Sequence, residues 1–166
     1  DITNPRWSYS LPKALGENLV ANSGLQFLIL RYFNIYGPRQ KDHFISEFYD
    51  RLRDNSAPTL NGNDTRSFCY VKDAVNMTIK VSDIASNQIL NIGRQEETKI
   101  ENVARLIMEN CGIDTDELRI LPSPKGSVSR RCPEMSKTME ILDGFEYTPL
   151  QDGLQMTISD YEGSNK

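Results

Sequence analysis

The sequence has no cluster of glycines. Ten glycines occur among the 166 residues, but even the nearest two, Gly16 and Gly24, lie too far apart to share one turn. A turn that holds the pyrophosphate of a dinucleotide needs glycines at the spacing Gly-x-Gly-x-x-Gly, because the backbone must approach the phosphates closely. The sequence therefore carries no dinucleotide fingerprint and no phosphate-binding Gly-rich loop.

Histidine and cysteine are scarce as well. His43 is the only histidine, so a Ser-His or Cys-His mechanism would depend on this one residue. We assign it instead to the surface or to the start of a helix. Cys69, Cys111 and Cys132 are odd in number and widely spaced, which favours neither a disulfide framework nor a zinc site. We expect no bound metal.

Long apolar runs are missing too. No stretch approaches the roughly 18 residues of a membrane span, and the first residues do not resemble a signal peptide. The formal charge of −4 and the isoelectric point near 5.1 give no electrostatic reason to expect nucleic acid or an anionic membrane as a partner. We therefore expect a soluble, cytoplasmic protein that is long enough for one domain with its own core.

A tyrosine and a lysine four residues apart stand near the start of the chain. On a helix, Tyr9 and Lys13 leave the same face one turn apart. A phenol with an ordinary pKa near ~10 is a poor base at neutral pH, but a nearby ammonium group favours the phenolate and lowers that pKa. The pair is thus a candidate catalytic base, and the lysine can also hold a ribose hydroxyl. The alternative is a plain amphipathic helix with a surface lysine and a half-buried tyrosine.

Pro12 sets the expected start of this helix. Proline has no N–H and clashes with the carbonyl four residues earlier, whereas the first turn of a helix tolerates it. We therefore expect the helix to begin at Ser8 or Tyr9, with Ser8 as a candidate cap, and to end before Gly24.

The next segment is a near-continuous apolar run over residues 25–33, in which Arg31 is the one charge. Such a run is typical of a strand that is buried on both faces of a parallel sheet. The loop after it, residues 34–39, then lies at the carboxyl end of a strand, where ligands bind in open α/β sheets.

Strands and helices alternate along the rest of the chain. Further helices are expected over residues 43–55, 73–84, 98–111, 135–142 and 150–161, with Asp73 and a Thr98–Glu101 capping box as start signals, and further strands over residues 66–71, 88–92 and 118–121. This alternation predicts an α/β or mixed fold in one unit.

Six ordered segments resemble the carboxyl-terminal part of the extended short-chain dehydrogenases, specifically the NAD-dependent nucleotide-sugar epimerase/dehydratase family. They are Tyr9-x-x-x-Lys13, the run from Arg31 to Pro38, Gly62 with the run from Thr65 to Asp73, Asn91-Ile92-Gly93, Arg131-x-Pro133-Glu134-x-x-Lys137, and Gly153-Leu154. Each alone is weak, but together they cover almost the whole chain and favour the catalytic reading of Tyr9. The run from Thr65 is most similar to UDP-glucuronate decarboxylases and UDP-glucose 4-epimerases.

The resemblance implies a fold, a cofactor and a reaction. The fold would be the carboxyl-terminal part of a Rossmann-like doubly wound α/β domain, over residues 1–40, followed by a small substrate-binding lobe, mostly over residues 41–166 with segments that return to the first part. Tyr9 would take the proton of a sugar hydroxyl while hydride passes to NAD, and Lys13 would bind the nicotinamide ribose. The keto-sugar so formed permits epimerisation, dehydration or decarboxylation.

The resemblance also implies substrate contacts. Asn34 would hold the pyrophosphate of a nucleotide sugar, most simply a UDP-sugar, unless it is only a turn residue at a strand end. Arg66 and Arg131 would clamp the same diphosphate, since a planar guanidinium suits phosphate, or they are solvated surface arginines. Glu134 would approach the ribose of the nucleotide.

Three departures and one gap separate the chain from the family pattern. Pro12 stands where many members have serine, Asp64 where many have a second glycine, and Glu134 where aspartate is usual. The front half of such an enzyme, with the NAD fingerprint, is not in the sequence, so we expect this chain alone to bind NAD poorly and to be inactive. The alternative function is a non-catalytic module that binds a nucleotide sugar or a partner.

The family resemblance further implies a homodimer in the complete enzyme. The helices that join the subunits in this family include the Tyr/Lys helix. Leu15 and Leu19 on that helix would then lie either in the dimer interface or in the core.

Overall fold

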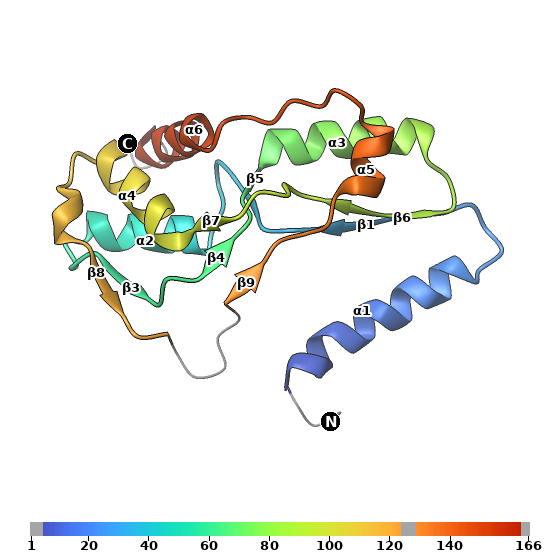
Figure 1. Ribbon diagram of the computed structural model, residues 1–166, viewed down its shortest axis with the longest axis horizontal. Coiled ribbons are helices and arrows are strands. Elements are labelled where there is room, and N and C mark those ends of the chain that lie inside the picture. The colour runs from blue at the N-terminus through green and yellow to red at the C-terminus, as the bar shows by residue number, and fades with distance from the viewer. Residues whose placement is uncertain (1–4, 124–128, 164–166) are drawn as a thin grey trace.

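The computed structural model describes residues 5–123 and 129–163, and the side chains from Ser10 onward within those ranges. Two groups of elements lie side by side along the long axis of the molecule (Figure 1). The first group is a sheet half, which we define as β1, β6, α1, α3 and α5. The second is a lobe, which we define as α2, α4, α6, β3 and β8. In the described residues no helix is both long and apolar enough to cross a membrane.

The sheet half is built on two parallel strands. β1 (Leu28–Tyr32) pairs with β6 (Gln88–Ile92), with Leu28 opposite Gln88 and Tyr32 opposite Ile92. α3 (Val71–Ile84) and α5 (Ser136–Ile141) pack on this pair. Their side chains form one hydrophobic cluster with the strands, in which Met77, Val81 and Ile92 are fully buried.

The lobe is organised by helices. α2 (Phe44–Arg53), α4 (Ile100–Asn110) and α6 (Leu150–Gly163) pack around a second cluster, which includes Phe48, Ile107 and Leu154. The parallel pair of β3 (Thr59–Asn61) and β8 (Arg119–Leu121) lies at the edge of the lobe, next to the short 3-10 helix η1 (Thr115–Glu117). The lobe therefore has a core of its own.

Short strands connect the two groups. β2 (Ile35–Tyr36) pairs in parallel with β5 (Cys69–Tyr70), directly before α3. β4 (Thr65–Arg66) lies between β7 (Thr98–Lys99), which is antiparallel to it, and β9 (Arg130–Arg131), which is parallel to it. This three-stranded sheet lies between the lobe and the sheet half (Figure 1).

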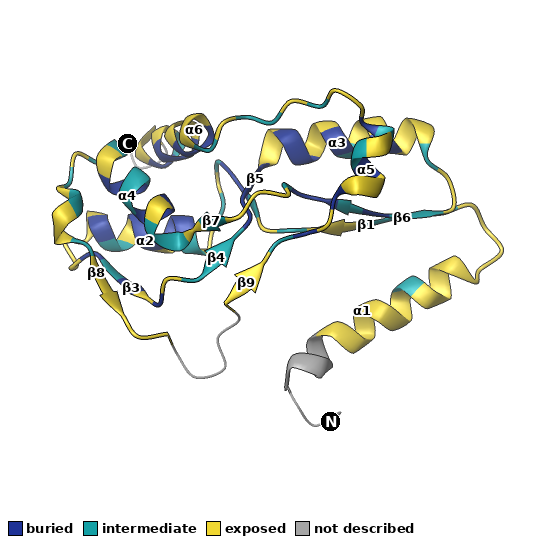
Figure 2. Cartoon of the chain, in the orientation of Figure 1, coloured by how far each residue is buried: buried dark blue, intermediate teal, exposed yellow. Residues whose placement is uncertain are grey.

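α1 (Pro5–Ala21) is set apart from the other helices (Figure 1). Its residues from Ser10 onward are exposed apart from Glu17, which is half-buried (Figure 2). The expected start at Ser8 or Tyr9 is wrong, because the helix begins at Pro5, where a proline is well placed, and it carries Pro12 in its interior. Pro12 is exposed, so the interruption of the hydrogen-bond pattern of the helix at this residue does not lie in a buried core.

Most predicted elements are confirmed, with four corrections. The expected strand over residues 66–71 is two strands, β4 and β5, which pair with different partners. Asp73 does not cap α3, whose N-cap is Tyr70, and no capping box starts α4, whose N-cap is Lys99. β1 is parallel as predicted but not buried on both faces, since its last two residues, Arg31 and Tyr32, are exposed.

Candidate functional site

The three-stranded sheet places the two predicted clamp arginines side by side. In the parallel pairing of β4 with β9, Arg66 is the register partner of Arg131, and Thr65 is the partner of Arg130. Register partners on neighbouring strands project from the same face, and such strands lie roughly 4.8 Å apart. Arg66 and Arg131 therefore share one face of the sheet, and Thr65 and Arg130 share the other.

The two arginines of the first face have different surroundings. The Arg66 side chain is 17% exposed, and its Nη2 lies 3.3 Å from Oδ2 of Asp64, whose side chain is 11% exposed. Nη1 of Arg66 donates to the carbonyl of Thr65 at 2.7 Å. Arg131 is exposed, and the ion pairs of the described part of the chain do not include it. A cation on this face is thus accessible to an anionic ligand.

On the opposite face of the sheet, the charge of Arg130 is paired with the carboxylate of Glu97. Glu97 accepts hydrogen bonds from Nε of Arg130 at 2.6 Å and from Oγ1 of Thr65 at 2.9 Å. These bonds, the one from Arg130 first, lower the pKa of Glu97 below its usual value. Arg130 and Arg131 are both exposed, but of the two only Arg130 forms one of the ion pairs of the described part of the chain.

Asn34 lies beside the same sheet. It lies between β1 and β2 with a positive φ of 44°, a conformation that asparagine tolerates and that is typical of a turn residue at a strand end. Its side-chain amide donates to the carbonyl of Ser67, and its own carbonyl accepts from the backbone N–H of Cys69 at 3.2 Å. These bonds tie the exit of β1 to the segment that follows Arg66.

The loop after Asn34 lines a surface cavity of about 460 Å³. Tyr36, Gly37 and Pro38 belong to its wall, together with His43, which is the N-cap of α2 as expected for a helix-start residue. The cavity lies at the carboxyl ends of β1 and β2, where the sequence predicted a ligand loop.

Glu134 is exposed and tied to the start of α5. Its carboxylate accepts from the backbone N–H of Ser136 at 2.7 Å, and the hydrogen bonds from Ser136 lower the pKa of Glu134. Its carbonyl accepts from the side-chain amide of Asn91 at 2.7 Å, at the end of β6. The segment that carries Arg131 and Glu134 is thus fixed against the sheet half.

Tyr9 and Lys13 lie on α1, away from this group. The side chain of Tyr9 falls outside the described residues, and Lys13 is exposed. α1 is linked to β1 by a bidentate ion pair between Glu17 and Arg31, with Nε to Oε1 at 2.8 Å, which lowers the pKa of Glu17. The structure brings Asn34, Arg66 and Arg131 together, and it places Lys13 on a separate element.

Asp64 is the residue of this site whose role the sequence reasoning missed. It was noted only as a departure from the family pattern, yet it pairs with Arg66. Residues two apart in an extended segment share a face, so the spacing from Asp64 to Arg66 was the available signal.

Glycines that approach other atoms closely are used for protein packing: a Cβ on Gly93 would lie 3.0 Å from Cβ of Phe33 and 3.2 Å from Cγ of Pro133, and a Cβ on Gly153 would meet the rings of Tyr36 and Tyr70. Both glycines therefore serve packing within the described ranges, 5–123 and 129–163. Within the same ranges, no group of His, Cys, Asp and Glu side chains could hold a metal ion.

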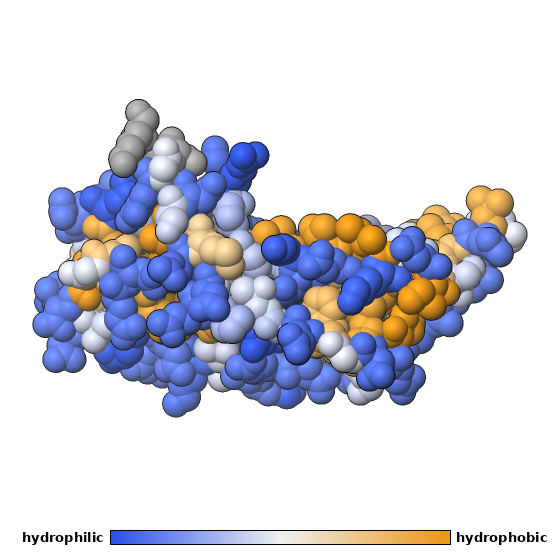
Figure 3. Space-filling model, turned by 90° about the horizontal axis from the view of Figure 1, so that it is seen from above, coloured by the Kyte–Doolittle hydropathy of each residue, from blue (hydrophilic) through white to orange (hydrophobic). Residues whose placement is uncertain are grey.

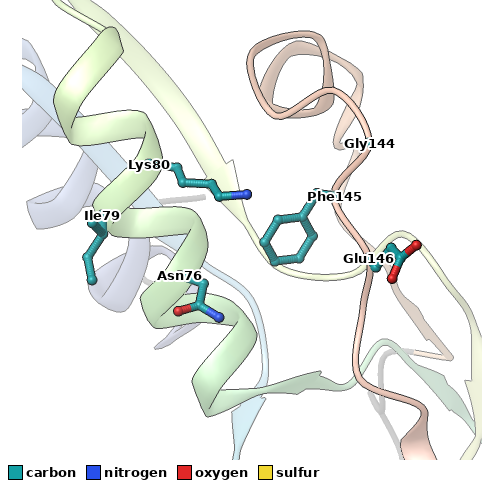
Figure 4. Close-up of a pocket in the computed structure, with 6 residues that line it drawn as sticks. All are labelled: Asn76, Ile79, Lys80, Gly144, Phe145 and Glu146. Atoms are coloured by element: carbon teal, nitrogen blue, oxygen red, sulfur yellow. The ribbon is translucent and has the colours of Figure 1, made fainter.

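Another surface cavity, of about 430 Å³, lies between α3 and the segment after α5 (Figure 4). Ile79 and Phe145 supply apolar walls, and the ammonium of Lys80 lies 5.4 Å from the centre of the Phe145 ring. It contains none of the predicted site residues, so we do not regard it as the substrate site.

The family model described as "NAD dependent epimerase/dehydratase family" matches residues 1–93, which is more than half of the chain. The chain belongs to this family. The predicted membership is thereby confirmed, and the solved structure described next, with a TM-score of 0.80, confirms the Rossmann-like α/β fold class.

Members of the family with established names show how far the similarity extends. UDP-N-acetyl-alpha-D-glucosaminuronate decarboxylase of Bacillus cytotoxicus is 33% identical over 92% of this chain and 52% of its own length. UDP-glucuronic acid decarboxylase 3 of Arabidopsis thaliana is 28% identical over 94% of this chain and 48% of its own length. The crystal structure of UDP-glucose 4-epimerase from Thermotoga maritima with UDP-glucose is 27% identical, with a TM-score of 0.80 over 95% of this chain and 52% of that chain. The chain thus spans about half the length of the relatives it matches.

Proposed function

We propose that this chain is the substrate-binding portion of an enzyme that epimerises, dehydrates or decarboxylates a nucleotide sugar, most simply a UDP-sugar, through a keto-sugar intermediate. The observation that carries the proposal is the register of β4 with β9, which sets Arg66 and Arg131 side by side on one face. Two guanidinium groups at that spacing suit the two phosphates of a nucleotide diphosphate.

The neighbouring residues support the same ligand. Asn34, at the exit of β1, is tied to Ser67, directly after Arg66. Glu134 follows Arg131 on a segment that is anchored to β6. We propose that Asn34 contributes to the diphosphate site and that Glu134 faces the nucleotide ribose.

The catalytic residues of the proposal are Tyr9 and Lys13. Tyr9 would take the proton of the sugar hydroxyl, and the ammonium of Lys13 would favour its phenolate. Lys13 is exposed on α1 and so is accessible to a ligand. Because the sequence has no Gly-x-Gly-x-x-Gly spacing, we propose that NAD is held mainly by protein outside this sequence and that the chain alone is inactive.

Exposed apolar surface supports the view that other protein covers the sheet half. Leu11, Leu15 and Leu19 on α1, and Val75 and Ile79 on α3, are all exposed. The apolar surface gathers on the half of the molecule that holds these helices (Figure 3). A second copy of the enzyme packing on Leu15 and Leu19, which lie outside the core of this chain, would account for the α1 part.

The register argument is tested with two adjacent arginines. UDP-glucose is titrated calorimetrically into the wild-type chain, into Arg131→Ala and into Arg130→Ala. We expect Arg131→Ala to weaken binding roughly tenfold or more, because a charged phosphate contact is lost, and Arg130→Ala to change it less than about threefold. Equal effects of the two substitutions would contradict the proposal.

A second candidate, a non-catalytic nucleotide-sugar module, is suggested by the missing Gly-x-Gly-x-x-Gly spacing and by the departures at Pro12, Asp64 and Glu134. The two functions differ in their need for Tyr9. In the protein completed with an NAD-binding half, Tyr9→Phe abolishes turnover of UDP-sugars if the chain is an enzyme portion. If the completed protein binds UDP-glucose but never reduces the nicotinamide of NAD, the chain is a non-catalytic binding module.

A further inference from the structure

The contact between Asp64 and Arg66 joins the residue just before β4 to the last residue of that strand. Both side chains are mostly shielded from solvent, and the ion pair spans 3.3 Å from Nη2 to Oδ2. The backbone of Asp64 is fixed as well, since its carbonyl accepts from the N–H of Ile100, the first residue of α4, at 3.0 Å. Asp64 is therefore anchored beside Arg66 through both its backbone carbonyl and its carboxylate.

The length of this contact distinguishes it from the other carboxylate on the sheet. Charge-assisted N–H···O bonds are typically about 2.7–2.9 Å long. Glu97 meets Arg130 at 2.6 Å on the opposite face, whereas Asp64 meets Arg66 at 3.3 Å. The pair on the face with Arg131 therefore has the longer contact of the two.

Carboxylate and phosphate oxygens compete for the same donors. A guanidinium group binds either anion through the same N–H groups, so Asp64 occupies Arg66 in the way that a phosphate oxygen would. A diphosphate that spans Arg66 and Arg131 would also bring its negative charge close to Asp64, and like charges at that range repel. Both effects oppose ligand binding at Arg66.

We propose that Asp64 is an internal competitor for the ligand phosphate at Arg66. Without ligand it holds the guanidinium in place, and an incoming diphosphate must displace it. The inference rests on the proposed nucleotide-sugar function, and it makes Asp64 a residue that sets affinity without touching the sugar. Wild-type binding is then weaker than the paired arginines would otherwise allow.

The test is a calorimetric titration of UDP-glucose into the full chain with the carboxylate removed. Asp64→Asn keeps the shape of the side chain and removes its charge, so we expect binding about fivefold tighter than in the wild type, the upper end for a partly exposed ion pair. Glu97→Gln, which removes the carboxylate on the opposite face, is the matched control and should leave the affinity within about twofold. Thermal melts of each variant, with Asp64→Ala as a second replacement, identify any loss of folding.

A double-mutant cycle separates competition from simple repulsion. In an Arg66→Ala background, Asp64→Asn should lose most of its gain, because there is no guanidinium left to release. If Asp64→Asn still raised the affinity for UDP-glucose by the full factor in that background, charge repulsion alone would explain the effect. That result would overturn the proposal that Asp64 competes with the ligand.

The remaining outcomes separate this inference from the proposed function. Weaker or unchanged binding in Asp64→Asn, while the wild type binds UDP-glucose, would show that Asp64 positions Arg66 or is neutral, and would overturn only the inference. Absence of UDP-glucose binding in every folded variant would overturn the proposed function as well.

Discussion

The lobe and the sheet half are about equally rich in apolar residues, but they bury them differently. In the lobe, α2, α4 and α6 direct their apolar faces at one another, and Phe48, Ile107 and Leu154 are completely buried. In the sheet half, α3 and α5 cover one side of β1 and β6, while apolar side chains of α1 and α3 stay exposed (Figure 2). The lobe completes its own core, and the sheet half does not.

This difference agrees with a division of labour within the proposed enzyme. A closed lobe can hold the adjoining three-stranded sheet in place, and β4 and β9 of that sheet present their arginines to a ligand. An incompletely covered sheet offers apolar surface to further protein, and large exposed apolar patches commonly mark such contacts. Three predictions test the comparison.

The largest expected effect concerns core and surface apolar residues. Phe48→Ala, in the lobe, should lower the free energy of unfolding by about 3–5 kcal/mol, because a fully buried ring leaves a cavity. Leu15→Ala, on α1, should change it by less than about 0.5 kcal/mol, because Leu15 is 57% exposed. Urea denaturation followed by circular dichroism measures both. A loss at Leu15 as large as that at Phe48 would mean that α1 is packed and would remove the contrast.

A smaller effect concerns a pair of hydrogen bonds that link α3 to the segment just before α6. The buried carboxylate of Asp73, on α3, accepts from the backbone N–H of Thr148 at 2.9 Å and from its hydroxyl at 2.8 Å, just before α6. Asp73→Asn should cost about 1–3 kcal/mol of unfolding free energy, since a buried acceptor is replaced. Asp83→Asn, at an exposed site on the same helix, is the control and should be neutral within about 0.5 kcal/mol. Equal stabilities of the two variants would show that Asp73 does not link the regions.

The smallest effect concerns the free energy of unfolding at alkaline pH. Here the two regions should behave alike. Burial raises the pKa of Tyr161, in the lobe, and of Tyr147, beside the sheet half, to about 12 each. An unfolded tyrosine ionises near ~10, so stability is complete below that pH and is lost as the pH rises toward 12. Tyr161→Phe and Tyr147→Phe should each flatten this decline in urea midpoints measured from pH 9 to 12. A slope identical to that of the wild type would exclude the tyrosine concerned.

Much of the fold was predictable because local patterns determine it. The apolar run before Asn34 gave a parallel strand, and the amphipathic patterns gave α2, α4 and α6 close to their observed bounds. The prediction failed where distant partners decide. Residues 66–71 are split because β4 pairs with β9 and β5 pairs with β2, and Asp73 binds Thr148 instead of capping its helix.

The sequence named residues for the candidate site but did not indicate how they are arranged. The family resemblance named Asn34, Arg66, Arg131 and Glu134 as substrate contacts, and those roles remain predictions. That Arg66 and Arg131 share a face depends on a register between segments far apart in the sequence. The same register explains why Arg130 pairs with Glu97 whereas Arg131 lies beside Arg66, because neighbouring residues of a strand point to opposite faces.

The central claim is that this chain carries the substrate contacts of the enzyme without the main NAD site, and two titrations of one sample test it. UDP-glucose and NAD+ are each titrated calorimetrically into the wild-type chain. The account predicts measurable binding of UDP-glucose and none of NAD+. Binding of NAD+ without binding of UDP-glucose would contradict it.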